Sequence, residues 1–162
     1  MIHELTGDLL LSEANLIAHG VAPGDHFTSG LALALRERWP SMAKDFRHWC
    51  HLNHPKAGGA WSWSGPNVHI ACLLTQDQAE DEGGTPGRAS TANVNHALRA
   101  LKGLIESEGH KSVALPRLAT GVGGLGWSEV KPLIEQHLGG LGIPVYVYSH
   151  YVAGQKATEP KA

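Results

Sequence analysis

Apolar and polar residues repeat with two periods along this chain, and the two periods predict strands and helices in alternation. Runs of strand length, in which apolar residues dominate or alternate with polar ones, cover residues 14–21, 59–64, 68–75, 113–116 and 143–148. Apolar residues spaced by three or four positions predict helices that begin near Ser29, Pro40, Ser90 and Ser128. A short opening segment ends at the turn signal Gly7-Asp8.

The order of these elements predicts the fold class. Strands and helices alternate through the second half of the chain, which favours a largely parallel central sheet with helices on both faces. The apolar run at 68–75 suits a strand inside that sheet, and Trp61 and Trp63 are expected on one face of the preceding strand. No repeat or long linker divides the chain, so we expect one domain over residues 1–150 and a flexible C-terminal tail over residues 151–162.

Composition narrows the range of functions. The chain has 13 lysine and arginine residues against 15 aspartate and glutamate residues, whereas a surface that grips a nucleic-acid backbone carries a clear basic excess. Its two cysteines, Cys50 and Cys72, cannot form a disulfide framework and are expected to be buried thiols. The sequence shows no signal-peptide pattern and no apolar run near the ~20 residues that span a bilayer. We therefore expect a cytoplasmic monomer with no membrane partner.

Two loops carry the pattern of an anion site. Residues 23–30 (PGDHFTSG) and residues 120–126 (TGVGGLG) each connect a strand to a helix and are rich in glycine and small hydroxyl side chains. Free N–H groups at a helix N-terminus attract anions, and glycine lets a phosphate approach the backbone closely. Two such loops at one sheet edge suggest a diphosphate between them, although each loop alone also fits an ordinary strand-to-helix turn. The loop at 76–88 is acidic and glycine-rich, and we expect it to be mobile.

The second glycine-rich loop also satisfies G-x-G-x-x-G, through Gly121, Gly123 and Gly126. A dinucleotide-binding domain places this motif in an early strand-to-helix turn, with an acidic residue about 20 residues later. Here the motif lies near the C-terminus, and the following strand ends without an acidic residue. We interpret the match as accidental.

A group of metal-type side chains occurs at His48, Cys50, His51 and His54. Zinc sites pair such a group with a second one at a defined spacing, and the sequence contains no second group. On a helix, His48 and His51 share a face while Cys50 points elsewhere. We therefore interpret these residues as surface histidines beside a buried thiol and expect no metal site and no cofactor.

Three segments resemble motifs of the macrodomain family, in the right order and spacing over about residues 1–148. They are Gly7-Asp8-Leu9-Leu10; Ala18-His19-Gly20-Val21 leading to Thr28-Ser29-Gly30-Leu31-Ala32; and Leu115-Pro116-Arg117-Leu118-Ala119-Thr120-Gly121 with Leu125 and Trp127. The chain resembles in particular the branch that contains the terminal ADP-ribose protein glycohydrolase and the antitoxins that reverse DNA ADP-ribosylation. This resemblance implies a three-layer α/β/α fold with a mixed, mainly parallel sheet and a cleft for ADP-ribose.

The resemblance also implies roles for individual residues. Asp8 would accept a hydrogen bond from the adenine amino group beside the Leu9 backbone, although a simple turn or cap role fits Asp8 nearly as well. The two glycine-rich loops would wrap the diphosphate and the distal ribose with backbone amides. The expected ADP-ribose-binding residues are Asp8, Leu9, Val21, His26, Phe27, Thr28, Ser29, Gly30, Leu31, Thr75, Thr120, Gly121, Val122, Gly123, Gly124 and Leu125.

The sequence departs from the glycohydrolase branch where that branch carries its catalytic residues. In the branch a lysine after the central strand attacks the distal ribose, but the matching run here, LTQDQ at 74–78, contains none. The acid of the second loop falls on Gly123, and the asparagine of many relatives is replaced by Ala22. A water-based mechanism remains, in which Asp25 or His19 orients or deprotonates the water. The alternative is that Asp25 is a loop residue and His19 a buried structural histidine.

These observations predict an ADP-ribosyl hydrolase that acts by water attack. The expected substrate is ADP-ribose in ester linkage to acidic side chains of a protein, or ADP-ribose attached to nucleic acid. Two alternatives stay open: a reader that binds ADP-ribose without turnover, and a phosphatase that acts on ADP-ribose 1″-phosphate.

Overall fold

The chain folds around a single six-stranded sheet in a computed structural model that describes residues 2–81, 84 and 86–161. The strands lie in the order β1-β6-β5-β2-β4-β3, and only β3 runs antiparallel to its neighbour. Their bounds are β1 Ile2–Gly7, β2 Leu16–Val21, β3 Ala60–Gly65, β4 Val68–Leu74, β5 Val113–Pro116 and β6 Val145–Tyr151. The prediction of a mixed, mainly parallel sheet is confirmed.

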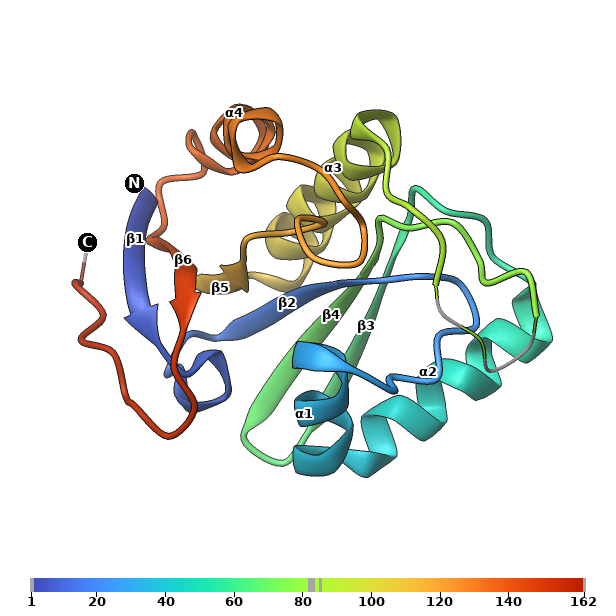
Figure 1. Cartoon of the computed structure of the whole chain (residues 1–162). Coiled ribbons are helices and arrows are strands. Elements are labelled where there is room, and N and C mark those ends of the chain that lie inside the picture. The colour runs from blue at the N-terminus through green and yellow to red at the C-terminus, as the bar shows by residue number, and fades with distance from the viewer. Residues whose placement is uncertain (1, 82–83, 85, 162) are drawn as a thin grey trace.

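Helices cover both faces of this sheet, as the alternation of elements predicted. Helices α3 and α4 pack on one face, and α1 and α2 pack on the other (Figure 1). Their bounds are α1 Gly30–Arg38, α2 Pro40–Asn53, α3 Thr91–Glu108 and α4 Trp127–Leu138, and a short 3-10 helix η1 spans Leu9–Leu11. The three-layer α/β/α architecture is therefore confirmed.

Local sequence accounts for most helix boundaries. The hydroxyl oxygen of Ser90 accepts a hydrogen bond from the backbone N–H of Asn93 at 3.1 Å, which makes Ser90 the predicted N-cap of α3. Helix α2 begins at Pro40 as predicted but ends at Asn53, three residues beyond the predicted end. The chain leaves α2 through His54, whose φ of 46° lies in the left-handed region. Because the helix continues beyond its predicted end, His51 lies on the same side of α2 as residues in the middle of the helix.

The two layers of helices each bury a core against the sheet. Trp61 and Trp63 oppose Cys72 and Ile70 on β4 and pack into the core beneath α2, so the prediction that they share a face is confirmed. The rings of Trp61 and Phe46 meet edge to face, with centroids 5.5 Å apart. Cys72 is a buried free thiol in this core, as expected.

The sheet also gathers the predicted loops at one edge. Because β1, β6, β5, β2 and β4 are parallel, their carboxyl ends lie at the same edge. Asp8 follows β1, residues 117–126 follow β5 and residues 22–29 follow β2. Read across the sheet, the order is Asp8, the second glycine-rich loop and then the first. Residues 82, 83 and 85 of the loop at 76–88, which was expected to be mobile, lie outside the described residues.

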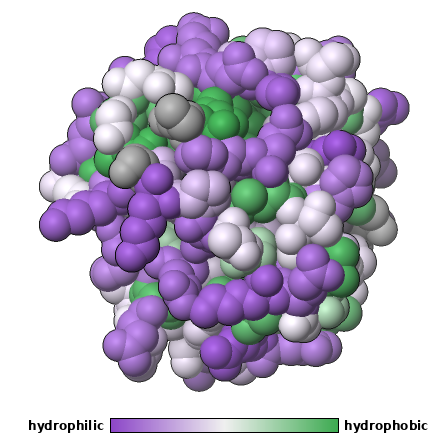
Figure 2. Space-filling model, turned by 90° about the vertical axis from the view of Figure 1, so that its left-hand side faces the viewer, coloured by the Kyte–Doolittle hydropathy of each residue, from purple (hydrophilic) through white to green (hydrophobic). Residues whose placement is uncertain are grey.

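The C-terminal segment 152–161 returns to the β1 side of the sheet. The carbonyl of Gln155 accepts a hydrogen bond from the backbone N–H of Asp8 at 2.7 Å, and the hydroxyl of Tyr148 donates to Glu159 at 2.7 Å. The side of the molecule on the left of Figure 1, where β1 and this segment lie, is mainly hydrophilic (Figure 2). The flexibility expected of this segment stays a prediction. Within the described residues, no helix is long and apolar enough to cross a membrane.

Candidate functional site

A cavity of about 280 Å³ opens between the two glycine-rich loops. We call it the inter-loop cavity. Its lining includes both loops, as the sequence predicted, together with the ends of β2 and β5. The predicted site residues that line it are His19, Asp25, Thr28, Ser29, Gly30, Leu31, Gly121, Val122 and Gly123.

The first glycine-rich loop presents a helix N-terminus to this cavity. Helix α1 begins at Gly30, and Ser29 occupies the N-cap position without a side-chain cap bond among the described residues. The first N–H groups of an α-helix have no intrahelical partner, and the helix dipole makes that end positive. The lining residues Ser29, Gly30 and Leu31 therefore offer backbone donors to an anion in the cavity.

The second glycine-rich loop reaches the cavity through its middle residues. Helix α4 begins at Trp127, and the backbone N–H of its N-cap residue Gly126 donates to Glu129 at 2.9 Å. The N–H groups of Gly124 and Leu125 donate to carbonyls within the loop, at 3.0 and 2.9 Å. Among the described residues that line this cavity, the loop contributes 121–123 and not 124–127, and a role for the N-terminus of α4 at the anion site stays a prediction.

Arg117 supplies a positive charge that sequence reasoning did not select. It follows the end of β5 and lines the inter-loop cavity, with its guanidinium carbon 5.6 Å from the ring centre of Trp127. Its Nε atom is buried and has no hydrogen-bond partner among the described residues. Two features of the sequence could have identified Arg117. It directly follows the carboxyl end of a parallel strand, and it lies in a segment that resembles the macrodomain family.

Asp25 holds the first loop in shape. Its carboxylate accepts hydrogen bonds from the backbone N–H groups of Ala22 at 3.1 Å and Phe27 at 2.8 Å, and the residue is 8% exposed. An ionised carboxylate has about four lone-pair positions, so acceptor capacity remains after these two bonds. Asp25 can therefore combine a structural role in the loop with a contact to a molecule in the cavity.

His19 lines the same cavity from the end of β2. Its Nε2 lies 3.2 Å from the sulfur of Cys72, and its Nδ1 is buried without a partner among the described residues. Burial lowers the pKa of His19 to about 3, so the ring is neutral near pH 7. His19 is 1% exposed with its Nδ1 buried, which leaves water little access to the ring, so Asp25 is the better placed of the two predicted candidates.

Several other predicted residues lie outside the inter-loop cavity. The carboxylate of Asp8 accepts from the backbone N–H groups of Leu10 at 2.9 Å and Gly154 at 2.8 Å, and Asp8 is 7% exposed. The threonine hydroxyl of Thr120 donates to the carbonyl of Arg117 at 2.9 Å. Four further predicted residues have fully buried side chains: Leu9, Val21, Phe27 and Thr75.

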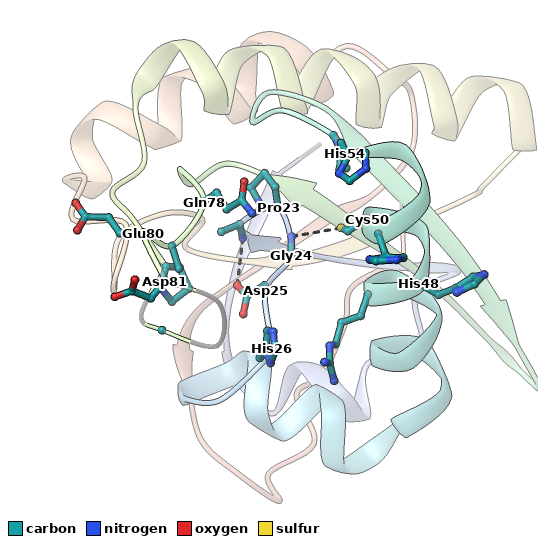
Figure 3. A pocket seen from close by; sticks show the side chains of 17 residues that line it. Pro23, Gly24, Asp25, His26, His48, Cys50, His54, Gln78, Glu80 and Asp81 are labelled. Atoms are coloured by element: carbon teal, nitrogen blue, oxygen red, sulfur yellow. Dashed lines mark hydrogen bonds between the residues drawn. The ribbon is translucent and has the colours of Figure 1, made fainter.

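A second cavity, of about 520 Å³, lies on the other side of the first glycine-rich loop. We call it the histidine cavity, because His26 from the loop and His48, His51 and His54 from α2 line it together with Arg47. Figure 3 shows Glu80 and Asp81 across the cavity from α2, with Pro23, Gly24, Asp25 and His26 between them.

Cys50 also lines the histidine cavity, so the prediction that it points away from the histidines is wrong. Its sulfur accepts a hydrogen bond from the backbone N–H of Gly24 at 3.3 Å, and burial raises the pKa of its thiol. Within the described part of the chain, no group of three or more histidine, cysteine or acidic side chains is arranged to hold a metal ion.

Known proteins resemble this chain in part of its sequence and in its fold. No model of a known protein family matches the sequence. Over 55 residues, 34% of this chain, the sequence is 44% identical to a DNA ADP-ribosyl transferase–DNA ADP-ribosyl glycohydrolase fusion protein of Thermosipho africanus. That match spans only 14% of the relative's length.

Solved structures resemble the whole chain. The macrodomain of Thermus aquaticus DarG superposes with a TM-score of 0.80 at 26% identity, covering 92% of this chain and 98% of that one. The structure of Thermosipho africanus DarTG in complex with ADP-ribose superposes with a TM-score of 0.78 at 21% identity, covering 96% of this chain and 42% of that one.

Proposed function

Because this chain has the macrodomain fold and resembles DarG-type macrodomains, we propose that it binds ADP-ribose and hydrolyses the bond between its distal ribose and a carrier molecule. The inter-loop cavity is the main structural support for this function. It combines the N-terminus of α1 and the glycine backbone of residues 121–123 around a space of about 280 Å³ that Arg117 also lines. This donor set suits a diphosphate.

The family resemblance and the strand order together suggest a direction for the bound molecule. The diphosphate lies between the loops that follow β5 and β2, which are neighbours in the sheet. Asp8 follows β1 at one side of these loops, and Asp25 lies at the other side. We expect the adenine at Asp8, the role that the family resemblance implies for this residue, and the distal ribose at Asp25.

The chemistry at Asp25 is a displacement by water. Asp25 accepts a proton from a water molecule as the water oxygen bonds to the anomeric carbon of the distal ribose. The bond from that carbon to the carrier oxygen breaks, and the carrier leaves with the bonding electrons. For the ester linkage predicted from the sequence, the products are ADP-ribose and a carboxylate, with the proton released to water. A carboxylate is a good leaving group, so this reaction needs no lysine nucleophile.

A reader function is the second candidate, and two observations favour it. Among the described residues, no lysine lines either cavity. The neutral, weakly basic His19 adds little to Asp25 as a proton acceptor. A reader would bind ADP-ribose as tightly as the proposed hydrolase but leave the carrier linkage intact.

Release of ADP-ribose from glutamate-modified protein distinguishes the two candidates. We expect release by the wild type and a fall of about 100-fold in kcat for Asp25→Asn, since general-base catalysis contributes about 10²–10⁴-fold. Asparagine keeps an acceptor for the N–H of Phe27 but not for that of Ala22, so affinity for ADP-ribose, measured by calorimetry, should fall far less than kcat. Binding without release by the wild type would exclude hydrolysis of this ester linkage and favour the reader, and equal release by Asp25→Asn would remove Asp25 from the mechanism.

A further inference from the structure

Gln76 lines the inter-loop cavity together with Asp25, although neither the sequence pattern nor the family resemblance gave it a role. We propose that the side-chain amide of Gln76 orients the water molecule that Asp25 deprotonates. This inference rests on the proposed function, which places the anomeric carbon of the distal ribose at Asp25. It adds a second residue of this chain to the hydrolysis reaction.

The backbone of Gln76 and the carboxylate of Asp25 are bonded to the same peptide group. The carbonyl of Val21 accepts a hydrogen bond from the N–H of Gln76 at 3.3 Å. The N–H of Ala22 belongs to the same peptide group and donates to the carboxylate of Asp25 at 3.1 Å. Because a peptide group is planar and rigid, it holds both residues at the carboxyl end of β2. A backbone bridge to Ala89 fixes Gln76 from a further side.

The side-chain amide of Gln76 is also held, and it keeps a free acceptor. Its Nε2 donates to the carbonyl of Gly87 at 3.1 Å, and the residue is 7% exposed. Among the residues that the structure describes, none donates a hydrogen bond to its Oε1. An amide oxygen can accept two hydrogen bonds. Since Gln76 lines the cavity, its Oε1 is available to a water molecule inside it.

Two acceptors are what an attacking water requires. Asp25 accepts one proton of the water, and the Oε1 of Gln76 accepts a hydrogen bond from the other O–H. With both O–H directions fixed, a lone pair of the water oxygen faces the anomeric carbon. As the new bond forms, the first proton moves to Asp25 and the second stays on the new hydroxyl of the ribose. The carrier oxygen leaves with the electrons of the broken bond.

A neutral amide suits this position. It neither gains nor loses a proton near pH 7, so it orients the water without competing with Asp25 for the proton. It is also not a nucleophile, so the displacement takes place in one step. This agrees with the run at 74–78, which contains no lysine.

The test compares Gln76→Ala with Gln78→Ala. The first variant removes the amide and leaves the backbone contacts to Val21 and Ala89 in place. We expect kcat for release of ADP-ribose from glutamate-modified protein to fall about tenfold, the effect of one hydrogen bond to the reacting water. Affinity for ADP-ribose, measured by calorimetry, should change by less than about twofold. The matched control, Gln78→Ala, removes the same amide from an exposed residue that lines the histidine cavity instead, and it should behave as the wild type does.

Added sodium azide gives a readout that a purely structural role for Gln76 would not change. Azide is an anionic nucleophile that needs no deprotonation. Its terminal nitrogen bonds to the anomeric carbon while the carrier carboxylate leaves with the bonding electrons. We expect azide to restore release by Gln76→Ala and to yield ADP-ribosyl azide, detected by mass spectrometry. Azide should have little effect on the wild type and on Gln78→Ala.

The outcomes separate this inference from the proposed function. Release by the wild type supports the proposed function whatever the variants do. An unchanged kcat for Gln76→Ala, an equal loss of kcat and affinity, or no acceleration by azide would each overturn the role of Gln76. Absence of release by the wild type would contradict the proposed function and this inference with it.

Discussion

The two ends of the proposed ADP-ribose cleft differ in how many of their hydrogen-bonding groups are already bonded to other residues of the chain. At the loop end, the first N–H groups of α1 and the backbone of residues 121–123 face a cavity. At the β1 end, both carboxylate oxygens of Asp8 accept backbone N–H groups, and one of the donors, Gly154, belongs to the C-terminal segment. A diphosphate can therefore bind without rearrangement, whereas an adenine that uses Asp8 has to share or replace the contacts that the carboxylate makes with Leu10 and Gly154.

The strongest test of the open end is Gly121→Val. Among the described residues, none has an atom within 4 Å of a side chain begun at Gly121, and its φ is ordinary for an L-residue. The valine therefore fits without disturbing the loop, and because Gly121 lines the inter-loop cavity we expect ADP-ribose affinity to fall about 100-fold, or roughly 2.7 kcal/mol. Calorimetry measures the affinity, and thermal denaturation should show an unchanged Tm.

Gly140→Val is the matched control for this prediction. Gly140 lies after α4 and likewise has no described atom within 4 Å of an added side chain. Its variant should bind ADP-ribose as the wild type does. Equal affinities for the two valine variants would show that the inter-loop cavity is not where ADP-ribose binds.

The buried imidazole at the open end makes stability depend on pH. His19 has a pKa of about 3 in the folded chain and about 6.5 when unfolded, so the unfolded state binds more protons between these values. Stability should therefore fall as the pH drops from 6.5 toward 3, by up to about 1.4 kcal/mol per pH unit from this group. Urea denaturation at several pH values should show a shallower slope for His19→Leu than for His96→Asn, an exposed control. Equal slopes would mean that His19 is protonated or accessible in the folded chain.

Removal of residues 152–162 tests the closed end. Truncation after Tyr151 frees the Asp8 carboxylate from Gly154 and its N–H from Gln155. If adenine competes with these contacts, ADP-ribose affinity should rise about fivefold, the equivalent of one net hydrogen bond. Gly154→Pro should act in the same direction, because proline cannot adopt the φ of 78° or donate the N–H. A lower affinity in both variants would show that the C-terminal segment forms part of the adenine site.

Local sequence was sufficient to predict the fold and the two loops that line the inter-loop cavity. The glycine and small hydroxyl residues at 23–30 and 120–126 identify both segments as loops from the local sequence alone. The alternation of strands and helices brings the two loops to one sheet edge. The closed end could not be predicted, because the contact of Gly154 with Asp8 joins residues that are far apart in the sequence. Periodicity carries no information about such pairings.

The histidine cavity was missed for a related reason. Its walls come from the loop after β2, from α2 and from residues 78–86, and no single segment shows a binding pattern. The end of α2 was predicted too early because its C-cap is His54. This residue adopts the left-handed conformation that is typical of glycine at a C-cap and unusual for histidine. Arg117 lay inside a recognised segment, but its exposure to the cavity depends on the fold of the whole loop.

The location of ADP-ribose can be measured directly by titrating ¹⁵N-labelled protein and following backbone amide signals by NMR. The signals of Gly30, Gly121 and Gly123 should show the largest shifts, because their amides line the space assigned to the diphosphate. The signal of Gly154 should shift as well if adenine reaches Asp8. An absence of shifts, or shifts confined to residues outside the two glycine-rich loops, would contradict the account.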